Sequence, residues 1–144
     1  MKKTATDSIR EFNRFYTGVI GLLDRQLLHT SYSLPEARVL YELHQAPACT
    51  AKDILARLPM DKGYLSRILS QFKKKGLLTR KKSVVDGRAV QITLTPQGKS
   101  EFEKLNRASD QQISSIMKNI PPQQLAELIN HMSAIKEILY QSVS

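Results

Sequence analysis

The chain has 144 residues, of which 41% are hydrophobic and 24% are charged, and its formal net charge is +9. This composition is typical of one soluble domain with a buried core and excludes a largely disordered chain. No apolar run approaches the roughly 18 residues that a membrane span needs, and the N-terminus lacks the apolar region of a secretory signal. We therefore expect a cytoplasmic protein without a membrane partner. The single cysteine, Cys49, cannot form an internal disulfide, which fits a reducing compartment.

The positive charge is concentrated in one segment. Residues 62–88 hold nine basic side chains and one acidic side chain, a net of +8 out of the total of +9. The basic residues are Lys62, Arg67, Lys73, Lys74, Lys75, Arg80, Lys81, Lys82 and Arg88. The rest of the chain is close to neutral, so a general basic bias does not explain the segment. Such clustering predicts a surface that binds a polyanion.

The first third of the chain shows helical periodicity. Apolar residues recur at spacings of three or four at Ile9, Phe12, Tyr16, Val19, Leu23 and Leu27, which predicts a helix from about Asp7 to His29. Ser33 can cap a second helix, since Pro35 follows in its first turn, and this helix should end near Pro47.

Two further helices are predicted in the middle of the chain. Thr50 and Asp53 fit a capping box that begins a helix of about two turns, which Pro59 stops. Asp61 can cap the next helix, whose buried face is Leu65, Ile68, Leu69 and Phe72. Its opposite face presents Gly63, Ser66, Arg67, Ser70 and Lys74.

A β-hairpin should follow the second of these helices. Gly76 can end the helix, and residues 77–82 begin an extended segment. Alternating apolar residues between Val90 and Leu94 predict a strand, and the Asp86-Gly87 pair is a tight-turn signal. Basic residues then line one arm of the hairpin, and Arg88 lies near its tip.

Two long helices complete the predicted chain. One begins at Thr95-Pro96 and continues to Pro121-Pro122, and the last carries apolar residues from Leu125 to Leu139. Together with the first helix, they have apolar stripes that one domain of this size can cover only in part. Each stripe residue by itself is more often core than interface, but the set favours a symmetric homodimer.

The order helix, short helix, helix, hairpin predicts a fold that is mainly α with a small β-hairpin wing, a winged helix-turn-helix domain flanked by N- and C-terminal dimerisation helices. The second helix of the pair enters the major groove of double-stranded DNA in this geometry. Arg67 is the candidate for a base contact, because Gly63 and Ser66 allow a close approach. The lysines and arginines at 73–75 and 80–82 are assigned to phosphates. The competing interpretation of 73–75 is a solvated helix end whose cations complement the helix dipole.

The full set of predicted DNA-contacting residues lies on the reading helix and the wing. It comprises Lys62, Gly63, Tyr64, Ser66, Arg67, Ser70, Lys73, Lys74, Arg80, Lys81, Lys82, Asp86 and Arg88. The arginine at the tip of the hairpin is expected to reach the neighbouring minor groove, where the negative potential favours it.

The sequence resembles the MarR family of bacterial transcriptional regulators over essentially its whole length. The most specific segments are 63–69 (GYLSRIL), 75–80 (KGLLTR), 86–88 (DGR) and 94–98 (LTPQG), in this order. The resemblance implies a single domain, 1–144, with dimerisation helices in 1–30 and 96–144 and the winged helix-turn-helix in 34–95. It also implies a homodimer on a pseudo-palindromic operator and a role for Asp86 and Arg88 in the minor-groove contact.

The family often responds to a small ligand or oxidant that weakens DNA binding. We expect a repressor with an effector pocket where the first, second and fifth helices meet, lined by Tyr16, Arg38 and Tyr41. No cysteine lies in the first helix, where the peroxide-sensing members carry theirs, so oxidation sensing is not expected.

Residues 12–43 are similar to a subgroup in which the regulator is fused to an acetyltransferase. The chain has no acetyl-CoA phosphate loop before its end at Ser144, so it is either a stand-alone relative or a truncated one. The alternative function is therefore a regulatory domain of an acetyltransferase system separated from its catalytic half. Nonspecific nucleic-acid binding is a third alternative.

Enzymatic chemistry is not expected. The chain has no catalytic or nucleotide-binding motif, since Gly98-Lys99 lacks the upstream glycine of a phosphate loop. His29, His44 and His131 are far apart and are more often ordinary helix residues than metal ligands. We predict no cofactor and no metal site.

Overall fold

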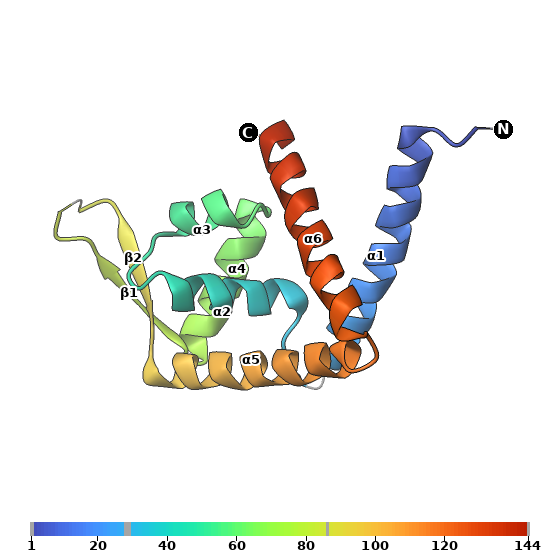
Figure 1. Cartoon of the computed structure of the whole chain (residues 1–144). Coiled ribbons are helices and arrows are strands. Elements are labelled where there is room, and N and C mark those ends of the chain that lie inside the picture. The colour runs from blue at the N-terminus through green and yellow to red at the C-terminus, as the bar shows by residue number, and fades with distance from the viewer. Residues whose placement is uncertain (1, 28–29, 86, 144) are drawn as a thin grey trace. The chain divides into compact units, whose positions relative to one another are not determined.

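The computed structural model describes residues 2–27, 30–85 and 87–143. Its described part is mainly helical and contains one two-stranded antiparallel sheet, as predicted (Figure 1). The elements are α1 (Ala5–Leu27), α2 (Leu34–Gln45), α3 (Ala51–Arg57), α4 (Lys62–Lys74), β1 (Leu78–Lys82), β2 (Val90–Leu94), α5 (Pro96–Met117) and α6 (Pro122–Val143). None of the described helices has both the length and the apolar character that crossing a membrane requires.

The chain divides into two compact units, Met1–Ala108 and Ser109–Ser144, and the boundary falls within α5. The first unit contains the helix-turn-helix elements and the hairpin. The second contains the end of α5 and all of α6.

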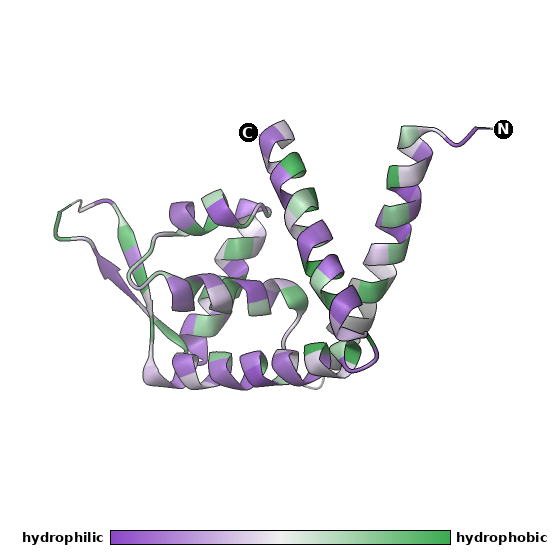
Figure 2. Ribbon diagram, viewed as in Figure 1, coloured by the Kyte–Doolittle hydropathy of each residue, from purple (hydrophilic) through white to green (hydrophobic). Residues whose placement is uncertain are grey.

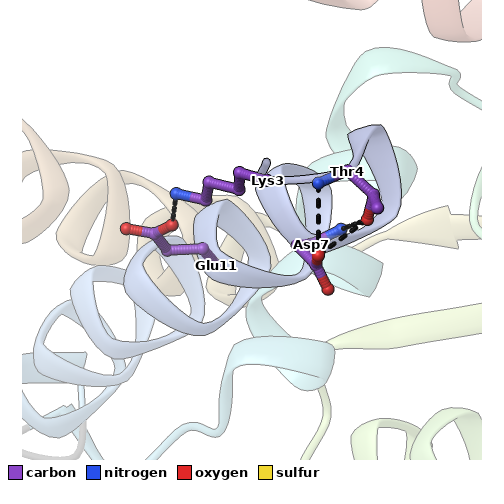
Figure 3. Close-up of polar contacts among 4 residues, drawn as sticks. All are labelled: Lys3, Thr4, Asp7 and Glu11. Atoms are coloured by element: carbon purple, nitrogen blue, oxygen red, sulfur yellow. Dashed lines mark hydrogen bonds and ion pairs between the residues drawn. The ribbon is translucent and has the colours of Figure 1, made fainter. Parts of the chain in front are cut away.

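Helix α1 begins two residues before the predicted start, because Thr4 caps it (Figure 3). The Thr4 N–H donates to the Asp7 carboxylate at 3.2 Å, and the Asp7 N–H donates to the Thr4 hydroxyl oxygen at 3.1 Å. The Thr4 hydroxyl and backbone N–H hold the pKa of Asp7 below its ordinary value. An ion pair between Lys3 and Glu11 spans the first turns. The predicted end at His29 lies outside the described residues.

The predicted caps of α2 and α3 are confirmed. Each is a reciprocal capping box, in which a hydroxyl accepts the N3 backbone N–H and the N3 carboxylate accepts the cap N–H. In α2 the Ser33 N–H donates to Glu36 at 3.0 Å, and in α3 the Thr50 N–H donates to Asp53 at 3.0 Å. The bond from the Thr50 backbone, followed by that from its hydroxyl, lowers the pKa of Asp53. Two short helices are thereby fixed locally at their starts.

Helix α4 also begins where predicted. The carboxylate of Asp61 accepts the Tyr64 N–H at 2.9 Å. The buried residues of α4 are Leu65, Ile68, Leu69 and Phe72, the predicted face. They join one core with residues of α2, α3, the hairpin and α5, including Val39, Leu40, Leu43, Ile54, Leu77, Leu78, Ile92, Leu94, Phe102 and Leu105. Burying one face of α4 in this way leaves its other face exposed.

The β-hairpin pairs β1 with β2 from Leu78↔Leu94 to Lys82↔Val90. The middle of β2 is also bonded to the segment just before α3, because the Ile92 N–H donates to the Cys49 carbonyl at 2.7 Å. Beyond the strands, the Ser83 N–H donates to the Ala89 carbonyl at 2.8 Å. The connecting loop is therefore longer than the two-residue turn that Asp86-Gly87 indicated, and Asp86 itself lies outside the described residues.

The hairpin, the end of α4 and the start of α5 meet in one tight junction. Gly76 has a φ of +76°, which a glycine adopts without strain. The Thr95 hydroxyl donates to the Gly76 carbonyl at 2.6 Å and accepts the Gly98 N–H at 3.1 Å. A Cβ on Gly98 would lie 2.0 Å from the Leu77 carbonyl oxygen. The contact places the root of the hairpin directly against α5.

Helix α6 begins at Pro122, and the Leu125 N–H donates to the Pro121 carbonyl at 2.9 Å. Its large apolar side chains remain substantially exposed, and Figure 2 shows hydrophobic residues along the helix. The exposed set is Leu128, Ile129, Met132, Ile135, Ile138, Leu139 and Tyr140. On the part of α1 whose side chains the structure describes, the exposed large apolar residues are Ile9, Phe12, Phe15 and Tyr16.

Candidate nucleic-acid interface

The exposed face of α4 carries the predicted reading residues. Gly63, Ser66, Arg67, Ser70, Lys73 and Lys74 are all exposed. Five side chains of this face line one shallow hollow of the surface, namely Ser66, Arg67, Ser70, Gln71 and Lys74. The hollow combines hydroxyl, amide and cationic groups, which are the groups that read base edges and bind phosphates.

The side chain of Arg67 lies back along the helix, toward its N-terminus. Its guanidinium carbon is 5.8 Å from the centre of the Tyr64 ring. Its Nη1 atom would lie 3.8 Å from a Cβ placed on Gly63. A cation–π contact with Tyr64, worth about 0.5–1 kcal/mol at an exposed site, favours this position of the arginine. Two of the predicted residues, Gly63 and Tyr64, are therefore neighbours of the Arg67 guanidinium.

Gln71 was not among the predicted contacts, although it shares the hollow. It lies four residues after Arg67, and residues at that spacing are neighbours on one helix face. A glutamine amide can bond an adenine edge with two hydrogen bonds. Its spacing of four residues from Arg67 is the sequence signal that would have placed Gln71 on the same exposed face.

The hairpin separates the three cations of β1 onto two faces. Arg80 pairs with Ile92 and Lys82 with Val90, whereas Lys81 pairs with Gln91. Side chains alternate along a strand, so Arg80 and Lys82 share the face of the buried Ile92 and Lys81 lies on the other face. Arg80 also lines a mainly apolar cavity between α4 and the hairpin, whose lining includes Lys62 and Ser66. Lys62 and Arg80 therefore lie on the two sides of the space between the reading helix and the wing.

Lys75 differs from its two neighbours, because its ammonium lies 5.5 Å from the centre of the Tyr32 ring. Tyr32 also packs edge-on against Phe72 and donates its hydroxyl to Glu101 at 3.2 Å. Burial, and then the Glu101 carboxylate, raise the pKa of Tyr32 to about 12. The end of α4 is linked to α5 through this tyrosine.

Arg88 and the three predicted effector residues lie outside the exposed face of α4. Arg88 is exposed in the loop at the end of the hairpin. Of the predicted effector residues, Tyr16 stacks on Phe12 within α1, Arg38 is exposed, and Tyr41 packs against Phe102 of α5.

Cys49 is buried at the entry to α3, and burial raises the pKa of its thiol. Among the side chains that the structure describes, those of residues 2–19, 30–85 and 87–142, no three from His, Cys, Asp or Glu gather in a way that could hold a metal ion.

A capped helix pair whose second helix exposes a cationic face, followed by a basic hairpin, defines a winged helix-turn-helix protein. The sequence model of the MarR family matches residues 31–89, from the start of α2 into the wing. Over this segment the chain is similar to the MarR family, and its fold is that of the winged-helix regulators of this family.

Known proteins resemble the chain beyond the matched segment. The transcriptional regulator SarZ of Staphylococcus saprophyticus is 31% identical over 109 residues, which cover 76% of this chain and 62% of that regulator. The crystal structure of a MarR family transcription regulator matches with a TM-score of 0.82 and 18% identity, over 96% of this chain and 91% of that one. Streptococcus pneumoniae FabT, crystallised with DNA, matches with a TM-score of 0.78 and 17% identity, over 92% and 98% of the two chains. These structural similarities extend the fold assignment across nearly the whole chain.

Proposed function

We propose that this protein is a transcriptional regulator that binds double-stranded DNA by inserting α4 into the major groove and the tip of the hairpin into an adjacent minor groove. The exposed face of α4 is the observation that carries the proposal. That face brings Arg67, Ser70 and Lys74 to one hollow while the opposite face is fixed in the core. A rigid helix with this division of residues fits the shape of a major groove.

The relatives support the proposal at the level of the family. SarZ is named as a transcriptional regulator, and the FabT structure contains DNA. The chain spans about 62% of the length of SarZ. The same functional assignment for this chain therefore rests on its own cationic face as well as on the relatives.

We further propose that two copies of the chain form the DNA-binding unit. The exposed apolar residues of α1 and α6 would be covered by a second copy. A two-fold dimer presents two reading helices to half-sites about one helical turn apart, which corresponds to a pseudo-palindromic operator.

The proposed mode of control is repression that a small effector relieves. Occupancy of an operator by a dimer excludes other proteins from the same DNA. An effector that binds near Tyr16, Arg38 or Tyr41 would act by favouring a dimer geometry that no longer fits both half-sites. The alternative of a separated acetyltransferase domain has no support among the relatives named above.

Selection of bound sequences from a random DNA pool, followed by binding measurements at several salt concentrations, tests the proposal. We expect an enriched sequence with two related half-sites and an affinity that falls steeply with salt, because phosphate contacts release counterions. Equal affinity for the selected and a scrambled duplex would instead indicate nonspecific binding. Affinity that does not depend on salt would contradict the assignment of the lysines and arginines to phosphates.

A further inference from the structure

The loop at the end of the hairpin carries two adjacent valines whose side chains are almost completely exposed. Val84 is 95% exposed and Val85 is 98% exposed, the highest values among the large hydrophobic side chains in the part of the chain that the structure describes. Figure 2 shows hydrophobic colour in this loop. A single exposed apolar residue is ordinary, but two adjacent ones at the tip of a projecting loop form a small apolar surface.

The folding of the hairpin does not require these valines. Strand pairing ends at Lys82↔Val90, and the Ser83 N–H closes the loop onto the Ala89 carbonyl. Neither valine belongs to the core cluster. Loops of this kind are usually built from glycine, proline, asparagine, aspartate and serine, because these residues favour turns. The apolar pair therefore indicates a contact outside the chain.

The charge around the valines selects the kind of partner. Residues 78–94 contain four basic residues and one acidic residue, Asp86. A second copy of the hairpin would bring the same positive charge against the first, so self-association through the tips is unfavourable. The partner must therefore offer negative charge to the basic residues. It must also offer an apolar surface, in a groove that a narrow loop can enter, to the valines.

The minor groove of DNA has both properties. Phosphates line its edges, and the C–H groups of the deoxyribose rings form its walls. The groove is about 6 Å wide. Many proteins that bind there combine arginine or lysine contacts with inserted apolar side chains, which shows that the groove accepts both kinds of group.

We propose that Val84 and Val85 enter the minor groove and pack against its deoxyribose walls, while the neighbouring cations of the wing bind the phosphates on either side. This inference rests on the proposed DNA-binding function. It assigns to the two valines a share of the affinity that comes from loss of water and releases no counterion. That share is therefore independent of salt, in contrast to the share of each cation.

Two variants of the full chain separate these contributions. The double variant Val84→Thr/Val85→Thr keeps the branched shape of both side chains but replaces one methyl group of each with a hydroxyl. Lys82→Gln removes one charge from the same arm. Each is titrated with the selected operator at several salt concentrations, and thermal unfolding checks that the fold is retained, as the exposure of the valines predicts.

The two variants should weaken binding in different ways. We expect the valine variant to bind about tenfold more weakly at every salt concentration, since partial burial of two valines is lost and the salt slope is unchanged. We expect Lys82→Gln to reduce the slope by about one per bound winged unit. In hydroxyl-radical footprints at matched occupancy, the valine variant should lose protection of the deoxyriboses under the wing and keep that under α4.

Three results would overturn the inference, and they differ from failure of the proposed function. Wild-type affinity in the valine variant would exclude the contact with the groove walls. A reduced salt slope in that variant would mean that the valines act only by positioning cations, and loss of protection under α4 would mean a general displacement. Absence of DNA binding by the wild-type chain, in contrast, would reject the proposed function itself.

Discussion

Arg67 and Tyr64 are one helical turn apart on α4, and the contact between them favours one position of the guanidinium before any DNA is bound. A restricted side chain loses less conformational entropy on binding than a mobile one. An arginine can bond the two acceptors of a guanine with its planar fork, whereas a lysine provides a single point of charge. The geometry around Arg67 therefore favours base recognition over a simple phosphate contact.

Substitution of Arg67 should change specificity more than general affinity. For Arg67→Ala we expect the discrimination between the selected operator and single-base variants to fall by about 1–3 kcal/mol at the base that the arginine contacts. Arg67→Lys is the matched control, because it keeps the charge and should lose the same discrimination with little change in the salt slope. Binding measurements on a panel of operator variants distinguish the two effects. A loss of equal size on all sequences would make Arg67 a phosphate contact.

Tyr32 should make the stability of the first compact unit depend on pH in the alkaline range. Its pKa is raised from the ordinary 10.0 to about 12 in the folded chain, by burial and by the Glu101 carboxylate. The neutral form is therefore favoured by folding, so the resulting stabilisation is complete below pH 10 and is lost as the pH rises toward 12.

Removing the Tyr32 hydroxyl should abolish this dependence. At neutral pH, we expect Tyr32→Phe to be less stable than wild type by about 0.5–1.5 kcal/mol, the usual value of one hydrogen bond. Between pH 10 and pH 12 the difference should shrink, because only the wild type then ionises at this position. Urea denaturation at both ends of this range measures it. A constant difference would contradict the stated cause of the shift.

At the scale of elements, the junction of α4, the hairpin and α5 sets where the wing projects. Thr95 bonds both Gly76 and Gly98, and Gly98 allows α5 to approach the Leu77 carbonyl. The hairpin therefore leaves the core from a point that is fixed on both sides. Correct placement of the wing relative to α4 depends on this contact rather than on the loop at the tip.

A methyl group at Gly98 should disrupt the junction. The added Cβ would lie 2.0 Å from the Leu77 carbonyl oxygen, which is backbone and cannot move without shifting β1. We expect Gly98→Ala to lower the free energy of unfolding by about 3 kcal/mol, at the upper end of overpacking effects. Gly87→Ala is the control, since nothing lies within 4 Å of its Cβ position and a change within about 0.5 kcal/mol is expected. Chemical denaturation compares them, and similar values for both variants would refute the role of the junction.

At the scale of the whole molecule, the exposed apolar residues are concentrated on the terminal helices, and the positive charge is concentrated on α4 and the hairpin. The charged surfaces repel one another between copies, whereas the apolar ones attract. This separation allows two chains to associate through their near-neutral parts and leave both cationic faces open to DNA.

A charge within the apolar stripe of α6 should dissociate the proposed dimer. Ile135 shares one helix face with Met132 and Leu139, so Ile135→Asp would place an unpaired carboxylate in the interface. We expect at least an approximately hundredfold weaker dimer, because burying such a charge costs several kcal/mol. Asn130→Asp adds the same charge on the polar face of the helix, beside Glu127 and Glu137, and should leave the dimer intact. Sedimentation at micromolar concentration measures both, and a wild-type monomer under these conditions would reject the interface.

The starts of α2, α3 and α4 could be predicted because their caps act over three residues. Ser33, Thr50 and Asp61 each bond a backbone N–H in the first turn, so the pattern is complete within the local sequence. The start of α1 was predicted two residues late, because the apolar spacing begins at Ile9 and does not reveal the cap at Thr4. The buried face of α4 was predicted correctly because helical periodicity alone defines it.

The sequence by itself determined the order of the elements, the two faces of α4 and the concentration of charge in residues 62–88, since all three depend on local spacing and composition. The tertiary structure decided which neighbours act on those residues. The Tyr32–Glu101 bond joins positions 69 residues apart, and the Thr95–Gly76 bond joins positions 19 residues apart. Contacts at such separations depend on how the core packs, so local sequence patterns cannot predict them.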